Sequence, residues 1–213
     1  MKLTLTFSPM ACSIVPYVAL TEAGATFDTL PVNLSKHQHH EPSYLKINPK
    51  GKVPALIIDG YPLTENTAIQ IWIANQFPQA NLLPKDPLEF AKAISIMSWC
   101  AAGIHPKLTQ QARPERYCDL PESAASVQAL GSHSLFEMLE IADSMLVNRE
   151  WFFDHFTSAD TYFYWCFRCG TQFKPDLSHF TNCMAHMQRI EQRPSVQKML
   201  AYEKSVIAQF NKT

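Results

Sequence analysis

Residues 48–56, which read Asn-Pro-Lys-Gly-Lys-Val-Pro-Ala-Leu, are the stretch that does most to decide the fold. Within it, Pro54 precedes an apolar run. A proline in that place holds the preceding residue extended and gives no hydrogen bond to a sheet. A trans Val53–Pro54 bond would simply begin a strand, whereas a cis bond would turn the Val53 N–H and C=O away from the sheet, free to bind an extended peptide. The stretch therefore predicts a strand from residue 53 and a candidate peptide-binding backbone at Val53.

The segments around this stretch alternate between strand and helix patterns. Period-2 alternation and short apolar runs indicate strands, and apolar residues three or four apart indicate helices. The predicted elements, in chain order, are a strand over 2–7, a helix over 12–23, a strand over 27–32, a strand over 53–58, an Asp59-Gly60 hairpin turn, and a helix over 65–76. Together they predict a small mixed sheet with helices packed on it.

The texture of the chain changes after Phe77. Pro78, Pro84 and Pro87 fall within ten residues, which is typical of a linker. Beyond the linker no strand pattern is evident, and the helical windows are 88–112, 122–147, 158–172, 177–191 and 195–209. We therefore expect an α/β domain over 1–79, a linker over 80–87 and an all-α domain over 88–213.

Composition excludes several classes of protein. Of the 213 residues, 46% are apolar and 17% charged, and the net charge is −1, so the basic excess of a nucleic-acid binder is missing. No run approaches the roughly 20 apolar residues that span a bilayer, and residues 1–7 alternate like a strand, unlike a signal peptide. We expect a cytoplasmic protein without nucleic-acid or membrane partners, whose six cysteines are free thiols.

Cys12 stands at the predicted start of the first helix. The unpaired N–H groups of a helix N-terminus stabilise a thiolate, which makes Cys12 a candidate reactive residue. The alternative is a small buried apolar side chain, the commonest role of a free cysteine. Val15 occupies the place where a C-x-x-C motif would have its second cysteine. A thioredoxin-type dithiol is therefore disfavoured, and redox chemistry here would need an external thiol.

The helix over 65–76 opens with Leu63-Thr64-Glu65-Asn66. Thr64 is a good N-cap, and the first helical N–H groups can hold a carboxylate. Glu65 could pair with an amine, and Asn66 could hydrogen-bond the same ligand. Plain helix capping is the alternative for this motif taken alone.

Taken together, these motifs resemble those of a known family. The Ala-Cys-Ser turn at 11–13, the run at 48–56 and residues 63–66 resemble the glutathione transferase family, most closely its bacterial beta class. Residues 156–162 resemble its buried capping motif, and residues 187–196 resemble its penultimate helix and turn. The resemblance implies a thioredoxin-like α/β N-terminal domain followed by an all-α C-terminal domain. It also implies a homodimer.

The resemblance further implies glutathione as co-substrate, with Cys12 and His105 as the catalytic residues. A lone histidine on an apolar helix is otherwise more often structural. The implied glutathione contacts are Cys12, Lys36, His37, Val53, Pro54, Glu65, Asn66, Ala102 and His105. Val53 would pair with the cysteinyl backbone, Glu65 and Asn66 with the γ-glutamyl end. The glycine carboxylate would meet Lys36 or His37, where relatives use a lysine.

The implied pocket for a hydrophobic electrophile contains Trp99, Trp165 and Arg168. Aromatic-rich helices are more often core than pocket, so only some of these side chains can face a ligand. Cys166 and Cys169 form a C-x-x-C inside a predicted helix, where packing is a better explanation than zinc, which normally takes four ligands. The His-Gln-His-His run at 37–40 is more easily read as a solvated loop. We expect no metal.

Such a protein could carry out either of two reactions, or it could be non-catalytic. Ionised glutathione could attack an electrophile, or Cys12 could form a mixed disulfide that a second glutathione resolves. Two adjacent thiolates repel, so one sulfur must stay protonated in the first reaction. The alternative to an enzyme is a binding or regulatory protein of the same shape that has lost turnover.

Overall fold

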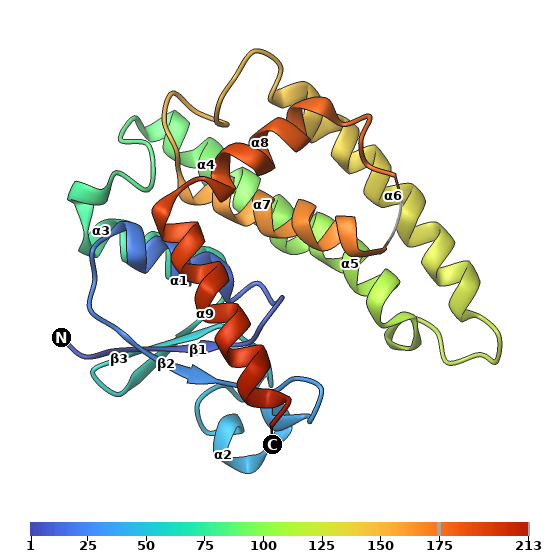
Figure 1. Ribbon diagram of the computed structural model, residues 1–213, viewed down its shortest axis with the longest axis horizontal. Helices are drawn as coiled ribbons and strands as arrows, with labels where there is room; N and C mark the ends of the chain where they lie inside the picture. Colours follow the sequence, from blue (N-terminus) through green and yellow to red (C-terminus); the bar gives the residue numbers. More distant parts are fainter. Residues whose placement is uncertain (174–175, 213) are drawn as a thin grey trace. The chain divides into compact units, whose positions relative to one another are not determined.

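The computed structural model describes residues 1–173 and 176–212, and it divides the chain into two compact units. The first unit comprises Met1–Leu83 and Glu191–Thr213, and the second comprises Pro84–Ile190 (Figure 1). Each unit is described by itself below. The predicted domain limits of 1–79, 80–87 and 88–213 stay a prediction.

The first unit is built on a four-stranded mixed sheet. Its strands are β1 (Leu3–Phe7), β2 (Asp28–Pro31), β3 (Ala55–Ile58) and β4 (Tyr61–Thr64), in the order β2-β1-β3-β4. β1 pairs parallel with β2 and antiparallel with β3, and β3 pairs antiparallel with β4. This confirms the predicted mixed sheet. The Asp59-Gly60 turn is also confirmed, because both residues have the positive φ, 47° and 94°, that tight hairpins favour.

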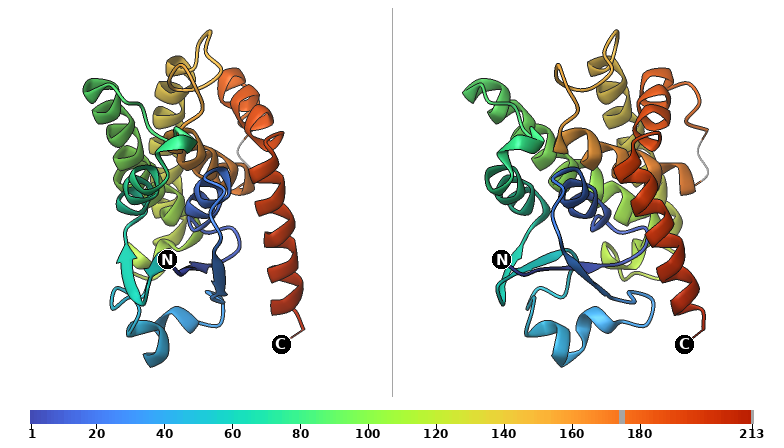
Figure 2. Two further views of the ribbon diagram at one scale, coloured as in Figure 1. Left: turned by 90° about the vertical axis from the view of Figure 1, so that its left-hand side faces the viewer. Right: turned by 60° about the vertical axis from the view of Figure 1, so that its left-hand side comes forward.

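Helices cover this sheet. They are α1 (Ile14–Glu22), the short α2 (Pro42–Leu45), α3 (Asn66–Gln76) and, from the end of the chain, α9 (Pro194–Phe210). Residues Ile14 to Leu20 are buried without interruption, because α1 packs against both α3 and α9. Figure 2 shows α9, in red, running alongside α1 and the sheet. The helix predicted over 195–209 is thus confirmed.

Aromatic and charged contacts fasten α9 to the rest of the first unit. The Tyr202 ring stacks on Tyr17, with centroids 5.2 Å apart, and its hydroxyl lies 2.5 Å from the Thr29 hydroxyl. The Arg193 guanidinium makes two 2.9 Å hydrogen bonds to the Glu22 carboxylate. Sequence periodicity finds α9 as a helix but cannot show which surface it covers.

The described residues of the second unit form helices joined by irregular connections, and they include no strand. Its longer helices are α4 (Pro87–Trp99), α5 (His105–Ala112), α6 (Ala124–Met145), α7 (Ser158–Gly170) and α8 (Thr181–Glu191), whose last residue is grouped with the first unit. These confirm the predicted helical windows, although α8 begins at Thr181 and not at 177. No helix among the described residues combines the length and apolar character that crossing a membrane requires.

The helical run predicted over 88–112 contains an irregular turn. A π-helical turn, η3 (Cys100–Ile104), joins α4 to α5. Pro106 stands two residues beyond the turn, and because proline has no N–H it cannot make the usual bond to the carbonyl four residues earlier. π-turns of this kind are frequent at functional sites. Here the turn ends immediately before His105.

Buried polar contacts fix the start of α7. Thr157 and Asp160 form a capping box, in which each side chain bonds the backbone N–H of the other residue. The Asp160 carboxylate also accepts hydrogen bonds from the Phe152 N–H and from His186 Nε2, both at 3.0 Å. The capping motif that the resemblance implied at 156–162 is therefore present.

Candidate active site

Cys12 lies in the turn that leads from β1 into α1. The helix begins at Ile14, two residues later than predicted, and Cys12 itself is 7% exposed. The Ser13 hydroxyl closes the turn, accepting from the Ser8 N–H at 3.0 Å and donating to the Ser8 carbonyl at 3.1 Å. The sulfur position is therefore set by a short, internally bonded loop.

The thiol of Cys12 is held in its neutral form. Burial raises its pKa to about 12, with a smaller contribution in the same direction from the Glu65 carboxylate. A hydrogen bond to the Cys12 backbone, together with Lys52 and Asn66, opposes this without cancelling it. The expectation that the helix start would favour a thiolate is wrong here, because desolvation of the charged form outweighs the helix terminus. The thiol instead donates to the Val53 carbonyl at 3.6 Å.

The Val53 backbone forms an open edge next to this thiol. The Val53–Pro54 bond is cis. Apart from the Cys12 thiol, no group within the described residues bonds the half-buried Val53 backbone, and its N–H has no partner there. The following strand is anchored separately, because the Ala55 N–H donates to the Thr6 hydroxyl at 2.7 Å. The Val53 N–H is thus free to pair with the backbone of an extended ligand.

The start of α3 differs from the predicted capping geometry. Thr64 ends β4 and is not the N-cap, because Glu65 takes the capping position with φ 70° and makes no side-chain cap. Asn66 is only 6% exposed, and its amide donates to the Cys12 carbonyl at 2.8 Å. Asn66 therefore supports the Cys12 loop from within.

Glu65, by contrast, points its carboxylate outward. It forms an ion pair with Lys50, whose ammonium also donates to the Thr64 hydroxyl at 2.8 Å. The side chains of Lys50 and Glu65 are 47% and 70% exposed. Glu65 is thus an accessible acidic group close enough to Cys12 to influence its pKa.

Lys36 and His37 are exposed on the loop after β2. Asn33 fixes this loop, since its side-chain oxygen accepts from the Ser35 and Lys36 N–H groups at 3.1 and 3.2 Å. His37 has a left-handed backbone with φ 58°. The side chains of Lys36 and His37 are therefore accessible to an anionic ligand. Separately, no group of three or more potential metal ligands is found among residues 1–173 and 176–212.

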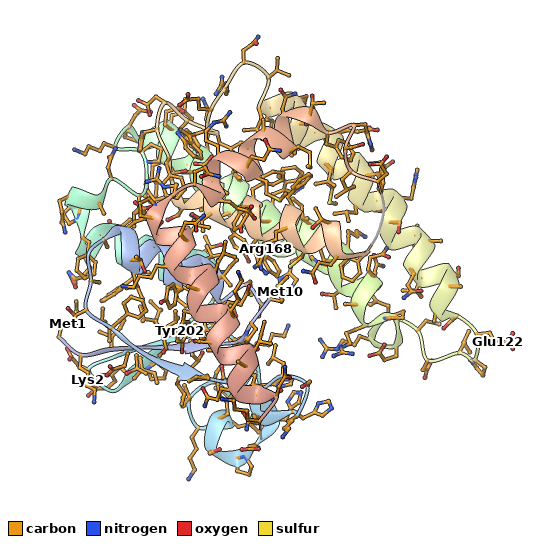
Figure 3. All side chains as sticks on the ribbon, in the orientation of Figure 1. Met1, Lys2, Met10, Glu122, Arg168 and Tyr202 are labelled. Atoms are coloured by element: carbon orange, nitrogen blue, oxygen red, sulfur yellow. The ribbon has the colours of Figure 1, made fainter. Side chains whose placement is uncertain are left out.

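Glu203 supports the Cys12 loop and was missed in the sequence. Its carboxylate accepts from the Met10 N–H at 2.8 Å. Met10, which Figure 3 labels, has a left-handed backbone with φ 60°. Glu203 is 3% exposed on α9, in the buried stripe that includes Met199 and Val206. An acidic residue within an apolar stripe was the available signal, because a buried carboxylate needs hydrogen-bond donors.

In the second unit, His105 is the first residue of α5 and is half-buried. Its ring meets the buried Trp165 ring edge-on at 4.5 Å. Trp99 is half-buried against Gly103, where an added Cβ would come within 2.7 Å of the indole. Ala102, within η3, is exposed.

The aromatic run of α7 is mostly core. Tyr162, Phe163, Tyr164, Trp165 and Phe167 are all buried, whereas Arg168 is half-buried. Of the predicted electrophile-pocket residues, Trp165 is thus inside the second unit, and Trp99 and Arg168 are partly accessible. Figure 3 labels Arg168. Cys166 is likewise buried and 4.0 Å from the Cys100 carbonyl, which agrees with a packing role.

Comparisons with known proteins agree with this architecture. The family model described as "Glutathione S-transferase, N-terminal domain" matches residues 2–75. "Glutathione S-transferase GstA" of Escherichia coli O157:H7 is 33% identical over 204 residues, covering 93% of this chain and 98% of the relative.

Solved structures are similar over most of the chain. A glutathione transferase homologue from Sulfitobacter with bound glutathione has a TM-score of 0.89 and 27% identity, covering 94% of this chain and 98% of that one. A bacterial beta-class enzyme from Sphingomonas chungbukensis has a TM-score of 0.83 and 35% identity, with the same coverage. With a thioredoxin-like sheet domain, a helical unit and these relatives, the chain belongs to the glutathione S-transferase family.

Proposed function

We propose that this protein is a glutathione-dependent transferase that conjugates glutathione to small hydrophobic electrophiles. The observation that carries the proposal is the unpaired Val53 N–H beside the neutral thiol of Cys12. Glutathione has an extended backbone, a thiol, an ammonium and two carboxylates. The first unit offers a partner of suitable chemistry for each.

The tripeptide would add along the Val53 edge. Its cysteinyl residue would accept from the Val53 N–H and donate to the Val53 carbonyl. That carbonyl accepts from the Cys12 thiol in the free protein. The incoming N–H would therefore release the Cys12 S–H to donate to the ligand's sulfur.

The two ends of glutathione would meet charged groups. Glu65 would accept from the γ-glutamyl ammonium, and the N–H groups at the start of α3 would take the adjacent carboxylate. Asn66 would contribute by holding the Cys12 loop, since its amide is already engaged. The exposed Lys36 and His37 would meet the glycine carboxylate.

In the conjugation step, a neutral Cys12 would stabilise an ionised glutathione sulfur. One S–H donor beside one thiolate avoids the repulsion of two thiolates. With a chloronitroarene, the glutathione sulfur forms a bond to the chlorine-bearing ring carbon, and the C–Cl bond breaks with its electron pair leaving as chloride. The thiol proton goes to solvent. We assign His105 as a second partner of this sulfur, and Trp99, Trp165, Arg168 and Ala102 to ligand contacts of the second unit, on the family resemblance.

Mixed-disulfide formation at Cys12 is then a slow side reaction. The thiolate is the attacking form of cysteine, and a pKa of about 12 leaves little of it at neutral pH. Incubation with oxidised glutathione followed by peptide mass spectrometry would measure it. We expect slow gain of one glutathionyl group on Cys12.

Retention on glutathione-agarose followed by a chloronitroarene assay tests the proposal. Retention with saturable turnover supports the transferase. Retention without turnover would instead support a binding or regulatory protein. A protein that shows neither retention nor turnover would refute glutathione as its ligand. Glu65→Gln should weaken retention, whereas the exposed Glu41→Gln, a matched change on the same unit, should not.

We further propose a cytoplasmic homodimer, in line with the family resemblance. Analytical ultracentrifugation tests the assembly directly. A single species with twice the 24.2 kDa chain mass is expected. A monomer at micromolar concentration would contradict this part of the proposal.

A further inference from the structure

Lys50 projects from a rigid turn in the first unit. The Gly51 N–H donates to the Asn48 carbonyl at 2.9 Å, and the Lys50 N–H bonds the Asn48 side chain at 3.2 Å. Asn48 is itself buried, and its amide donates to the Lys52 carbonyl at 2.7 Å. The backbone at Lys50 is therefore fixed, and only its side chain can change its contacts.

That side chain reaches the start of α3. Its ammonium donates to the Thr64 hydroxyl and pairs with the Glu65 carboxylate. The α-ammonium of a γ-glutamyl group is also a primary ammonium, and the same carboxylate and hydroxyl are acceptors of the kind that it needs. Lys50 thus places, on Glu65, the functional group that the proposed substrate carries.

We propose that Lys50 competes with the substrate ammonium for Glu65. This inference rests on the proposed glutathione function, and Lys50 is not among the glutathione contacts proposed above. In the free protein Lys50 neutralises Glu65, and binding an ammonium-bearing tripeptide displaces the Lys50 side chain into solvent. Its role is therefore to lower affinity, so that its removal strengthens binding.

The size of the effect follows from exposure. Both partners of the ion pair are about half exposed or more, and exposed pairs contribute little to stability. Replacing Lys50 by methionine keeps most of the apolar stem and removes the ammonium. We expect glutathione to bind about two- to five-fold more tightly to Lys50→Met than to the wild type, as breaking an exposed pair of this kind allows.

A double-mutant cycle by isothermal titration with glutathione tests the competition. The proteins are the wild type, Lys50→Met, Glu65→Gln and the double variant. We expect Lys50→Met to bind glutathione more tightly than the wild type when Glu65 is present. In proteins that carry Glu65→Gln, the Lys50 change should not increase affinity. Lys46→Met removes the same charge from an exposed lysine of the same unit and should not tighten binding.

Each other outcome has a distinct meaning. Weaker binding of Lys50→Met would overturn the inference, because Lys50 would then be holding a carboxylate of glutathione. An equal gain in both Glu65 backgrounds would also overturn it, because no competition for Glu65 would be involved. If none of the four proteins bound glutathione, the proposed function itself would fail, and this inference with it.

Discussion

Two thiols show how single-residue environments differ in this protein. Cys12 is buried, and burial raises its pKa to about 12 from an ordinary value of 9.0. Cys118 is half-exposed, and hydrogen bonds from the Leu120 backbone and the Ser123 hydroxyl lower its pKa below 9.0. Because the thiolate is the reactive form, Cys118 should react faster with an external reagent than Cys12, although Cys12 is the candidate active-site thiol.

The pH dependence of alkylation measures this difference. As pH rises, the Cys118 rate with iodoacetamide should level off at a lower pH than the Cys12 rate, because hydrogen bonds lower the pKa of the Cys118 thiol. The Cys12 rate should still be rising above pH 9, because its raised pKa postpones ionisation. Peptide mass spectrometry at pH 7.5 should show Cys118 modified on the order of 10³-fold faster. A Cys12 rate that levels off near pH 7 would contradict the neutral thiol.

The Asn66 side chain makes two buried hydrogen bonds: its amide donates to the Cys12 carbonyl at 2.8 Å, and its oxygen accepts from the Gln70 amide at 3.3 Å. Asn66→Ala should lower the free energy of unfolding by about 1–3 kcal/mol, because buried polar groups lose their partners. Asn75→Ala makes the same change at an exposed position of α3 and should stay within about 0.5 kcal/mol. Urea denaturation measures both. Equal losses in the two variants would show that the buried hydrogen bonds of Asn66 add nothing to stability.

At this scale the sequence predicts some residues and not others. Cys12 and Val53 are found from local motifs, because a turn before a helix and a Val-Pro pair before a strand are local features. The inward direction of Asn66 and the pairing of Lys50 with Glu65 depend on segments far apart in the chain, so local pattern cannot supply them. Glu203 could have been found from the apolar stripe that it interrupts.

Among the helices, α9 positions the loop that carries Cys12 through the Glu203–Met10 bond. Glu203→Ala removes the acceptor for a left-handed residue two places from Cys12. We expect about tenfold lower kcat/KM in the chloronitroarene assay, since small misplacements of reacting groups are costly. Glu203→Gln keeps an acceptor oxygen and should restore most of the rate.

Tyr202→Phe is the matched control for α9. It removes the hydroxyl contact with Thr29 from the same helix while keeping the stacked ring. Its kcat/KM should remain within about twofold of the wild type, since the loss of this one partly exposed hydroxyl contact has a small effect. If Glu203→Gln were as impaired as Glu203→Ala, the acceptor role of Glu203 would be disproved.

The start of α7 depends on one buried carboxylate. Asp160 accepts from Phe152, Thr157 and His186. Asp160→Ala leaves these donors unpaired and should destabilise the protein by about 3–5 kcal/mol. Asp154→Ala, at an 89% exposed side chain, should cost less than about 1 kcal/mol. Thermal melting compares the two, and similar melting temperatures would refute the importance of the cap.

The sequence predicts the helices and strands themselves well, and their ends less well. α1 starts at Ile14 and not at Cys12, because the turn at 11–13 is held by its own hydrogen bonds. Thr64 fails as an N-cap because β4 extends through it. The π-turn before His105 was not predicted, since apolar periodicity changes little across five residues.

For the whole molecule, the order of elements in the chain differs from their grouping in space. The first 83 residues and the segment from Glu191 onward form one unit, although the whole of the helical unit lies between them in sequence. Contacts such as Glu22–Arg193 join residues far apart in the chain, which no window of sequence can reveal. The family resemblance, by contrast, extends over nearly the whole chain, and it is at this scale that it is most informative.

Cys12 as a protonated donor to the glutathione sulfur is tested most directly by the ultraviolet absorbance of the glutathione thiolate in the complex. The titration would be followed against pH for the wild type and for Cys12→Ala. In the wild-type complex the glutathione thiol should ionise well below its pKa in free solution, and in Cys12→Ala it should ionise closer to the free value. Identical titrations in the two complexes, or a Cys12 thiolate absorbing near neutral pH without glutathione, would contradict it.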